Sequence, residues 1–142
     1  MASSQVPVSK ILLWTLVFGV MFNLLGWLGN NLLLGDDWDL ANAGVEMGYN
    51  PPWSPLVKEI ITVVSDFVFA FSIISLFAIA GKRTVGTALK LAGLVWVVGV
   101  AILYLVLVNS GFLPIDIAWK TSLLALAIFV LGAPILPLVI KG

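Results

Sequence analysis

The sequence predicts an all-α integral membrane protein, a bundle of four antiparallel transmembrane helices with both termini in the cytoplasm. Three observations support this prediction. Of the 142 residues, 61% are hydrophobic and 10% are charged, whereas about a quarter of the residues in a soluble domain are charged. Four long apolar runs make up most of the chain, and the basic residues gather at one set of their ends. We therefore expect residues 1–142 to form a single transmembrane domain.

Each apolar run is long enough to cross a bilayer as a helix. A helix needs about 20 residues to span the hydrocarbon core, and it satisfies its own backbone hydrogen bonds there. The strands of a membrane barrel would appear as alternating segments of about ten residues, and the sequence has no such pattern. The expected helices are Ile11–Leu34, Leu56–Ala80, Val85–Val108 and Ile117–Ile140.

Residues that start and end helices lie between these runs. Ser54-Pro55 offers an N-cap followed by a proline in the first turn, and Thr84 offers a second N-cap. Gly81 is expected to end the second helix in a left-handed conformation. Because the connection between the second and third helices is so short, they should be antiparallel neighbours. Pro134 and Pro137 should bend the end of the fourth helix.

The basic residues predict the orientation of the bundle. No lysine or arginine lies in the loop Gly35–Pro55. Because basic residues are retained on the cytoplasmic side, both termini and the turn at 81–84 should be cytoplasmic, and loop 35–55 should be non-cytoplasmic. Any homo-oligomer should then be parallel. The basic residues on the cytoplasmic side are Lys10, Lys82, Arg83, Lys90 and Lys141.

The composition also excludes several classes of function. The chain has no cysteine and no histidine, which excludes disulfides, the usual zinc sites, haem held by either residue and histidine-centred triads. The net charge is zero, so there is no basic surface for nucleic acid. We therefore expect no metal or cofactor, and the lipid bilayer as the main partner.

The loop between the first two helices is the one long polar segment. Its residues 37–47 are expected to form a short amphipathic helix at the interface. Two interpretations remain open for this loop. It could close over a site in the bundle, or Trp38 and Trp53 could simply anchor it at the membrane surface, where tryptophan is common.

Two polar residues lie near the middle of the predicted bilayer. Asp66 lies ten positions from Leu56, and Asn23 lies eleven positions from Leu34, which corresponds to depths of about 15 and 16 Å. A carboxylate at such a depth costs about 2.5–3.5 kcal/mol on insertion scales. Asp66 should therefore face the interior of the bundle or a water-filled cavity.

A second polar level is expected nearer the outside. Asn30 lies seven residues from Asn23, and Glu59 lies seven residues from Asp66, so each pair shares a helix face. Lys120 should reach the same level and pair with Glu59. These residues predict a polar pocket that opens outward. The candidate catalytic residues are Asp66 and Glu59, and the candidate ligand-binding residues are Asn23, Trp27, Asn30, Tyr104 and Lys120.

The sequence leaves several functions open. An enzyme or binding protein could use Asp66 as a general acid or base on a lipid-like or apolar small molecule, for isomerisation, cyclisation or hydration. A proton- or cation-coupled transporter or channel subunit would use Asp66 as its coupling site and would work as a parallel homo-oligomer. The chain could also be an accessory subunit of a larger membrane complex. In the structural alternative, Asp66 bonds Asn23 and only fixes the helix pairing.

Overall fold

A computed structural model describes residues 6–39 and 54–140, and all regular structure within these ranges is helical. Four helical stretches are long and apolar enough to cross a membrane, which confirms the four predicted helices. The part of the predicted loop helix that lies in the described ranges, residues 37–39, is helical, and this helix already begins at residue 35. Residues 40–47 of that prediction lie outside the described residues. The four stretches are Val8–Leu33, Glu59–Ile79, Val85–Asn109 and Ile115–Val139.

The first two long helices are α1 (Val8–Leu33) and α3 (Pro55–Ile79). The start of α3 follows the prediction, because the Ser54 hydroxyl accepts a hydrogen bond from the Val57 N–H at 3.4 Å and a proline occupies the first turn. Helix α1 begins three residues earlier than expected. The Pro7 carbonyl accepts the first amide hydrogen bonds of this helix, so the helix can start directly after that residue.

The third long helix is interrupted at its centre. It consists of α4 (Val85–Trp96), the π-helical segment η1 (Val97–Ala101) and α5 (Ile102–Asn109). Thr84 caps α4 as predicted, accepting the Thr87 N–H at 3.2 Å. The prediction for Gly81 is wrong, because α3 ends through an extended Ala80 and the one positive φ in the described ranges belongs to Gly111. The π-helical segment was not predicted.

The fourth long helix ends as its prolines predict. It consists of α6 (Ile115–Gly132), the 3₁₀ turn η2 (Ala133–Ile135) and α7 (Leu136–Val139). Pro134 lies in η2 and Pro137 lies in α7. A proline cannot donate a backbone hydrogen bond, so the regular α-helical pattern is broken at this point.

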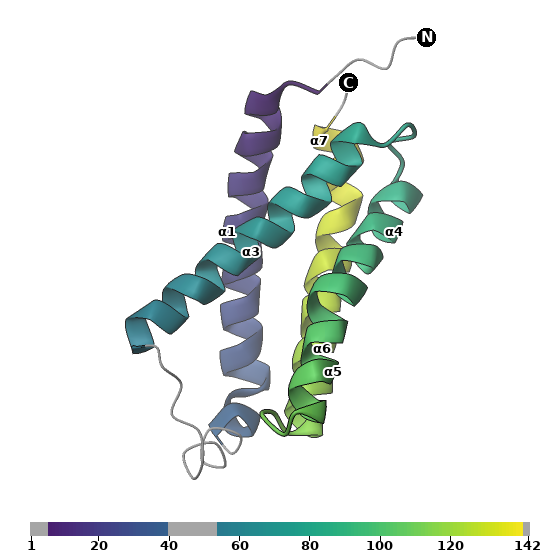
Figure 1. Cartoon of the computed structure of the whole chain (residues 1–142). Coiled ribbons are helices and arrows are strands. Elements are labelled where there is room, and N and C mark those ends of the chain that lie inside the picture. Colours follow the sequence, from purple (N-terminus) through teal and green to yellow (C-terminus); the bar gives the residue numbers. More distant parts are fainter. Residues whose placement is uncertain (1–5, 40–53, 141–142) are drawn as a thin grey trace.

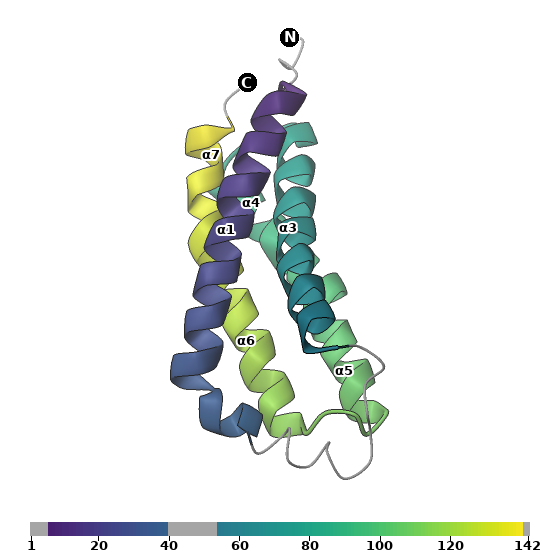
Figure 2. The ribbon, with the colours of Figure 1, turned by 90° about the vertical axis from the view of Figure 1, so that its left-hand side faces the viewer.

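Helix α1 contacts both α3 and α6. In Figure 2 it lies between α7 and α3 in the upper half, whereas in the lower half α6 is seen between α1 and α3. The start of α1, the turn between α3 and α4, and α7 all lie at one end of the molecule (Figure 1). At the other end, the first turns of α3 lie well away from α5 and α6 (Figure 1). Every side chain from Glu59 to Val64 is accordingly exposed. Helix α3 therefore completes the bundle only over its second half.

The core lies mainly toward the end that holds the start of α1 and α7. Two contacts between helices depend on glycine. The ring of Phe67 lies directly over Gly19, where a Cβ would come within 2.8 Å of the ring Cγ. A Cβ on Gly99 would likewise lie 2.6 Å from Phe69 Cε1. Small residues allow membrane helices to approach closely, so these two rings fix where α3 crosses its neighbours. The largest fully buried side chains are Ile74, Phe77, Ile117, Leu136 and Ile140.

Candidate functional site

Asp66 lies on the side of α3 that faces α1. A Cβ placed on Gly26 would lie 4.0 Å from Asp66 Oδ2, so the carboxylate is directed toward the backbone of α1 at that glycine. The side chain is half-buried. In the described ranges no side chain or backbone group forms a hydrogen bond or an ion pair with it. The carboxylate is therefore sheltered by a neighbouring helix and still available to another molecule.

Asn23 lies at the same crossing of α1 and α3. Its side-chain nitrogen donates to the carbonyl oxygen of Gly19 at 2.9 Å and to that of Val63 at 3.3 Å. An amide nitrogen has two hydrogens to donate, so both are used by backbone oxygens, one on each helix. The hydrogen bond of the structural alternative, between Asn23 and Asp66, is thus not formed. Asn23 therefore joins the two helices and does not pair with Asp66.

Tyr104 belongs to the same region but comes from α5. The side chain is half-buried and packs against the main core. Its phenol lies close enough to Asp66 for the two groups to interact electrostatically. Three helices therefore contribute to the surroundings of this carboxylate: α3 carries it, α1 shelters it and α5 supplies a hydroxyl group nearby.

The second polar level is built differently from the prediction. Asn30 accepts a hydrogen bond from Trp38 Nε1 at 2.9 Å instead of facing Glu59. Lys120 forms an ion pair with Asp37, at 2.7 Å between Nζ and Oδ1, and the expected pair with Glu59 is wrong. The physical reason is the direction of α3, whose first turns diverge from α6 and leave the Glu59 side chain exposed. The partners of Asn30 and Lys120 are therefore Trp38 and Asp37, which follow α1 in the chain.

Trp27 does not lie with the other candidates. Its side chain is 65% exposed, so its ring lies on the outer surface of the bundle. Only Asn23, Asp66 and Tyr104 are thus brought close to one another. Asn30 and Lys120 lie at the end of the molecule opposite the start of α1, where each is bound to the helical residues 35–39.

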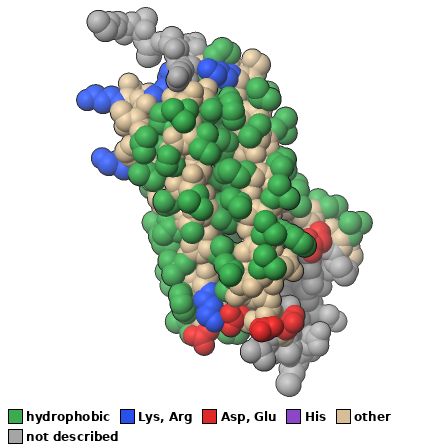
Figure 3. Space-filling view, turned by 180° about the vertical axis from the view of Figure 1, so that it is seen from behind, with side chains coloured by type: hydrophobic (Ala, Val, Ile, Leu, Met, Phe, Trp, Pro, Cys, Tyr) green, Lys and Arg blue, Asp and Glu red, His purple; other side chains and the backbone are tan. Residues whose placement is uncertain are grey.

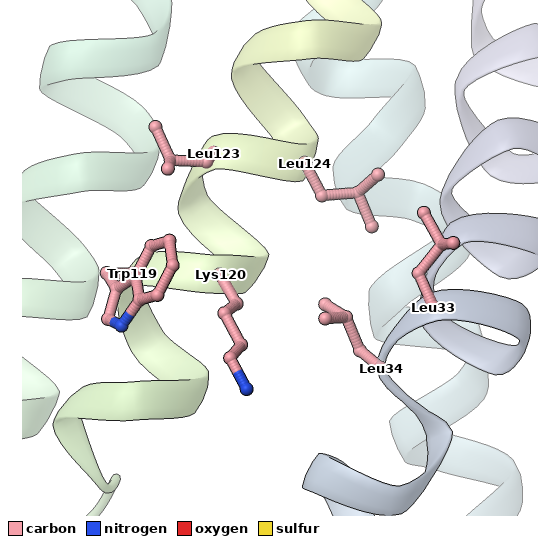
Figure 4. A pocket seen from close by; sticks show the side chains of 6 residues that line it. All are labelled: Leu33, Leu34, Trp119, Lys120, Leu123 and Leu124. Atoms are coloured by element: carbon pink, nitrogen blue, oxygen red, sulfur yellow. The ribbon is translucent and has the colours of Figure 1, made fainter.

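A cavity of about 300 Å³ lies at this same end, between the end of α1 and the start of α6 (Figure 4). Four leucines and Trp119 make its wall apolar, and Lys120 supplies its polar group. Of the residues proposed from the sequence, only Lys120 lines it. The sequence did not predict Asp37 as the partner of Lys120. An acidic residue just after a transmembrane helix is nevertheless well placed to meet a lysine in the first turns of a neighbouring helix. The lining residues are Leu33, Leu34, Trp119, Lys120, Leu123 and Leu124.

Within residues 6–39 and 54–140, no three acidic side chains lie together as a metal site would require. No family model, curated protein or solved structure matches this chain.

Proposed function

We propose that the protein is an antiparallel four-helix bundle in a membrane, with both termini and the turn at 81–84 in the cytoplasm and loop 35–55 on the opposite side. The distribution of charge supports this orientation. On the face seen in Figure 3, acidic side chains gather at one end and most basic side chains gather at the other. Basic ends are retained in the cytoplasm, and the turn at 81–84 carries two of the seven basic residues.

We propose further that the protein binds and transforms an apolar or lipid-like small molecule, with Asp66 as the proton donor or acceptor. The observation that carries this proposal is the Asp66 carboxylate beside Gly26, which forms no hydrogen bond or ion pair with any residue in 6–39 or 54–140. Asp66 lies seven residues from Glu59 and thirteen from Ile79, so about 10 and 20 Å of helix lie on its two sides. An unpaired charge is costly at that depth, and a ligand that hydrogen-bonds the carboxyl group reduces this cost.

The surroundings of Asp66 suit proton transfer on an apolar substrate. Isomerisation, cyclisation and hydration each need a proton to be added to or taken from carbon or oxygen, and a positioned carboxyl group performs both steps. Asn23 holds α1 and α3 together at the acid, and the Tyr104 hydroxyl could bind a polar group of the substrate. The exposed Glu59, on the same face of α3, could exchange protons with water.

The first experiment asks whether Asp66 holds a ligand. The protein is purified in mild detergent, and the small molecules extracted with it are compared by mass spectrometry between the native chain, Asp66→Asn and Asp39→Asn. Asp39 is exposed and serves as the matched control. We expect at least one compound to be retained by the native chain and by Asp39→Asn but lost from Asp66→Asn. Equal retention by all three proteins contradicts the proposal.

A second experiment asks whether Asp66 is reached from the hydrocarbon. An apolar carbodiimide, which modifies carboxyl groups from the lipid side, should label Asp66 in liposomes. A water-soluble carbodiimide should label the exposed Asp39 and Glu59 instead. The sites are identified by peptide mass spectrometry. Labelling of Asp66 by the water-soluble reagent alone would place it outside the bilayer.

A proton- or cation-coupled transporter in a parallel homo-oligomer is the second candidate. It is favoured by the exposed side chains from Glu59 to Val64, because a neighbouring copy could cover them and complete a pathway past Asp66. Proton flux into liposomes that contain the native chain, abolished in Asp66→Asn and unchanged in Asp39→Asn, would favour this candidate over the enzyme.

A further inference from the structure

We propose that the cavity between α1 and α6 binds a phospholipid whose head group carries a phosphate and a primary ammonium, as in phosphatidylethanolamine. One acyl chain lies along the leucines, the phosphate binds Lys120, and the ammonium binds Asp37. This inference is independent of the proposed function, because it uses none of the residues around Asp66.

The shape and lining of the cavity fit an acyl chain. Its volume of about 300 Å³ is at the lower end of the range for small-molecule sites, so it suits one chain. Leu123 and Leu124 form its far wall, and Lys120 and Trp119 lie one turn closer to the start of α6 (Figure 4). A chain that follows these leucines therefore leaves the polar head of the lipid beside the ammonium group of Lys120.

The ion pair at this cavity is accessible and can be opened. The Lys120 and Asp37 side chains are 32% and 31% exposed, with 2.7 Å between Nζ and Oδ1. Ion pairs of this exposure contribute only about 0–1 kcal/mol, so a ligand that provides both charges can replace the contact. A zwitterionic head group leaves neither Lys120 nor Asp37 without a partner, since its phosphate meets the ammonium and its own ammonium meets the carboxylate.

The neighbouring charges select a zwitterion over an anion. Asp36 and Asp39 flank Asp37 in the chain, and Asp116 lies one turn before Lys120 on the same helix face. Lys120 is the one basic side chain that the structure describes at this end. An anionic lipid would be repelled by the surrounding carboxylates and would leave Asp37 unpaired. A choline head group has no N–H to donate, whereas a primary ammonium has three.

The depth of the ion pair also fits a head group. Trp38 and Trp119 lie in the same part of the molecule as the pair, and tryptophan is enriched where the bilayer meets water. Lys120 lies five residues after the start of α6 at Ile115, about 7.5 Å along the helix. The ion pair is thus placed at the level of lipid head groups, with the leucines extending toward the hydrocarbon.

Native mass spectrometry tests the proposal on the full chain. The protein is exchanged into detergent with equal amounts of phosphatidylethanolamine, phosphatidylcholine and phosphatidylglycerol that have identical acyl chains. We expect phosphatidylethanolamine to be retained up to about fivefold over each of the others, the ratio that corresponds to the upper value of about 1 kcal/mol for an exposed ion pair. Lys120→Gln and Asp37→Asn should each remove this preference. Lys90→Gln, which changes an exposed charge on α4 away from the cavity, should keep it, and so should Lys120→Arg.

Three results would overturn the proposal. Preferential retention of phosphatidylglycerol, lost only in Lys120→Gln, would show a simple anion site. Equal retention of all three lipids would show unselective contact with the bilayer. Stronger retention in Asp37→Asn would show that Asp37 competes with the ligand instead of binding it. Helicity and thermal stability of each variant, measured by circular dichroism, separate loss of the site from loss of the fold. Because Asp66→Asn should retain the lipid, failure of this proposal and failure of the proposed function are distinguishable.

Discussion

Replacement of Gly19 by alanine should destabilise the bundle, although alanine is the better helix former. In a helix interior the change from glycine to alanine alone gains about 0.5–1 kcal/mol. Here the new Cβ would overlap the ring of Phe67, including its Cγ at 2.8 Å. Because Cγ lies on the axis about which the ring flips, a ring flip cannot clear the contact, and either Phe67 must leave its rotamer or α1 and α3 must separate. Overpacking of this kind costs about 1–3 kcal/mol, so we expect a net loss of about 1–2 kcal/mol.

A double-mutant cycle isolates this contact. Unfolding in mixed micelles of mild detergent and dodecyl sulfate is followed by circular dichroism for Gly19→Ala, Phe67→Ala and the double mutant. In the Phe67→Ala background Gly19→Ala should become stabilising, which gives a coupling of about 2 kcal/mol. Gly93→Ala is the matched control, because no atom lies within 4 Å of its added Cβ. If Gly19→Ala and Gly93→Ala have equal effects, or if the loss is the same in both backgrounds, the reasoning about this crossing is wrong.

Two further changes test the packing of the other helices in the same unfolding assay. Ile74→Ala should lower the free energy of unfolding by about 2 kcal/mol, since it leaves a cavity in a fully buried position. Ile79→Ala, at a side chain that is 80% exposed, should change it by less than about 0.5 kcal/mol. Similar losses at both positions would contradict the described core. Trp96→Phe should cost about 1 kcal/mol, because it removes the 2.7 Å hydrogen bond from Nε1 to the Ser122 carbonyl. The exposed Trp27→Phe serves as its control, and an equal loss there would show that the indole hydrogen bond contributes nothing.

The sequence predicted the extent of each helix but not the tilt of α3. Apolar length defines a transmembrane helix directly, and caps such as Ser54 and Thr84 are local signals, so both were predicted correctly. The direction of α3 depends on which rings enter which glycine positions, here Phe67 at Gly19 and Phe69 at Gly99. Such a pairing between distant residues cannot be deduced from hydrophobicity.

The candidate site was predicted only in part, because its second level depends on the same tilt of α3. Counting residues along two helices placed Asn23 and Asp66 at one level, and both do lie at the crossing of α1 and α3. The same counting assumed that α3 stays parallel to its neighbours as far as Glu59. Because it diverges, the partner of Lys120 comes from Asp37, in a segment that the depth argument did not consider.

The π-helical segment Val97–Ala101 determines which side α5 turns toward the core. Ala88, Ala92, Val100 and Tyr104 all face or pack against that core, and they are spaced by multiples of four. In an unbroken α-helix sixteen residues overshoot four turns by about 160°, which would rotate Tyr104 to the far side. A π-bulge accommodates one extra residue and reduces this overshoot to about 60°. Deleting a single residue from this segment should therefore restore regular α-helix and keep the phenol beside Asp66, whereas inserting one there should swing it away.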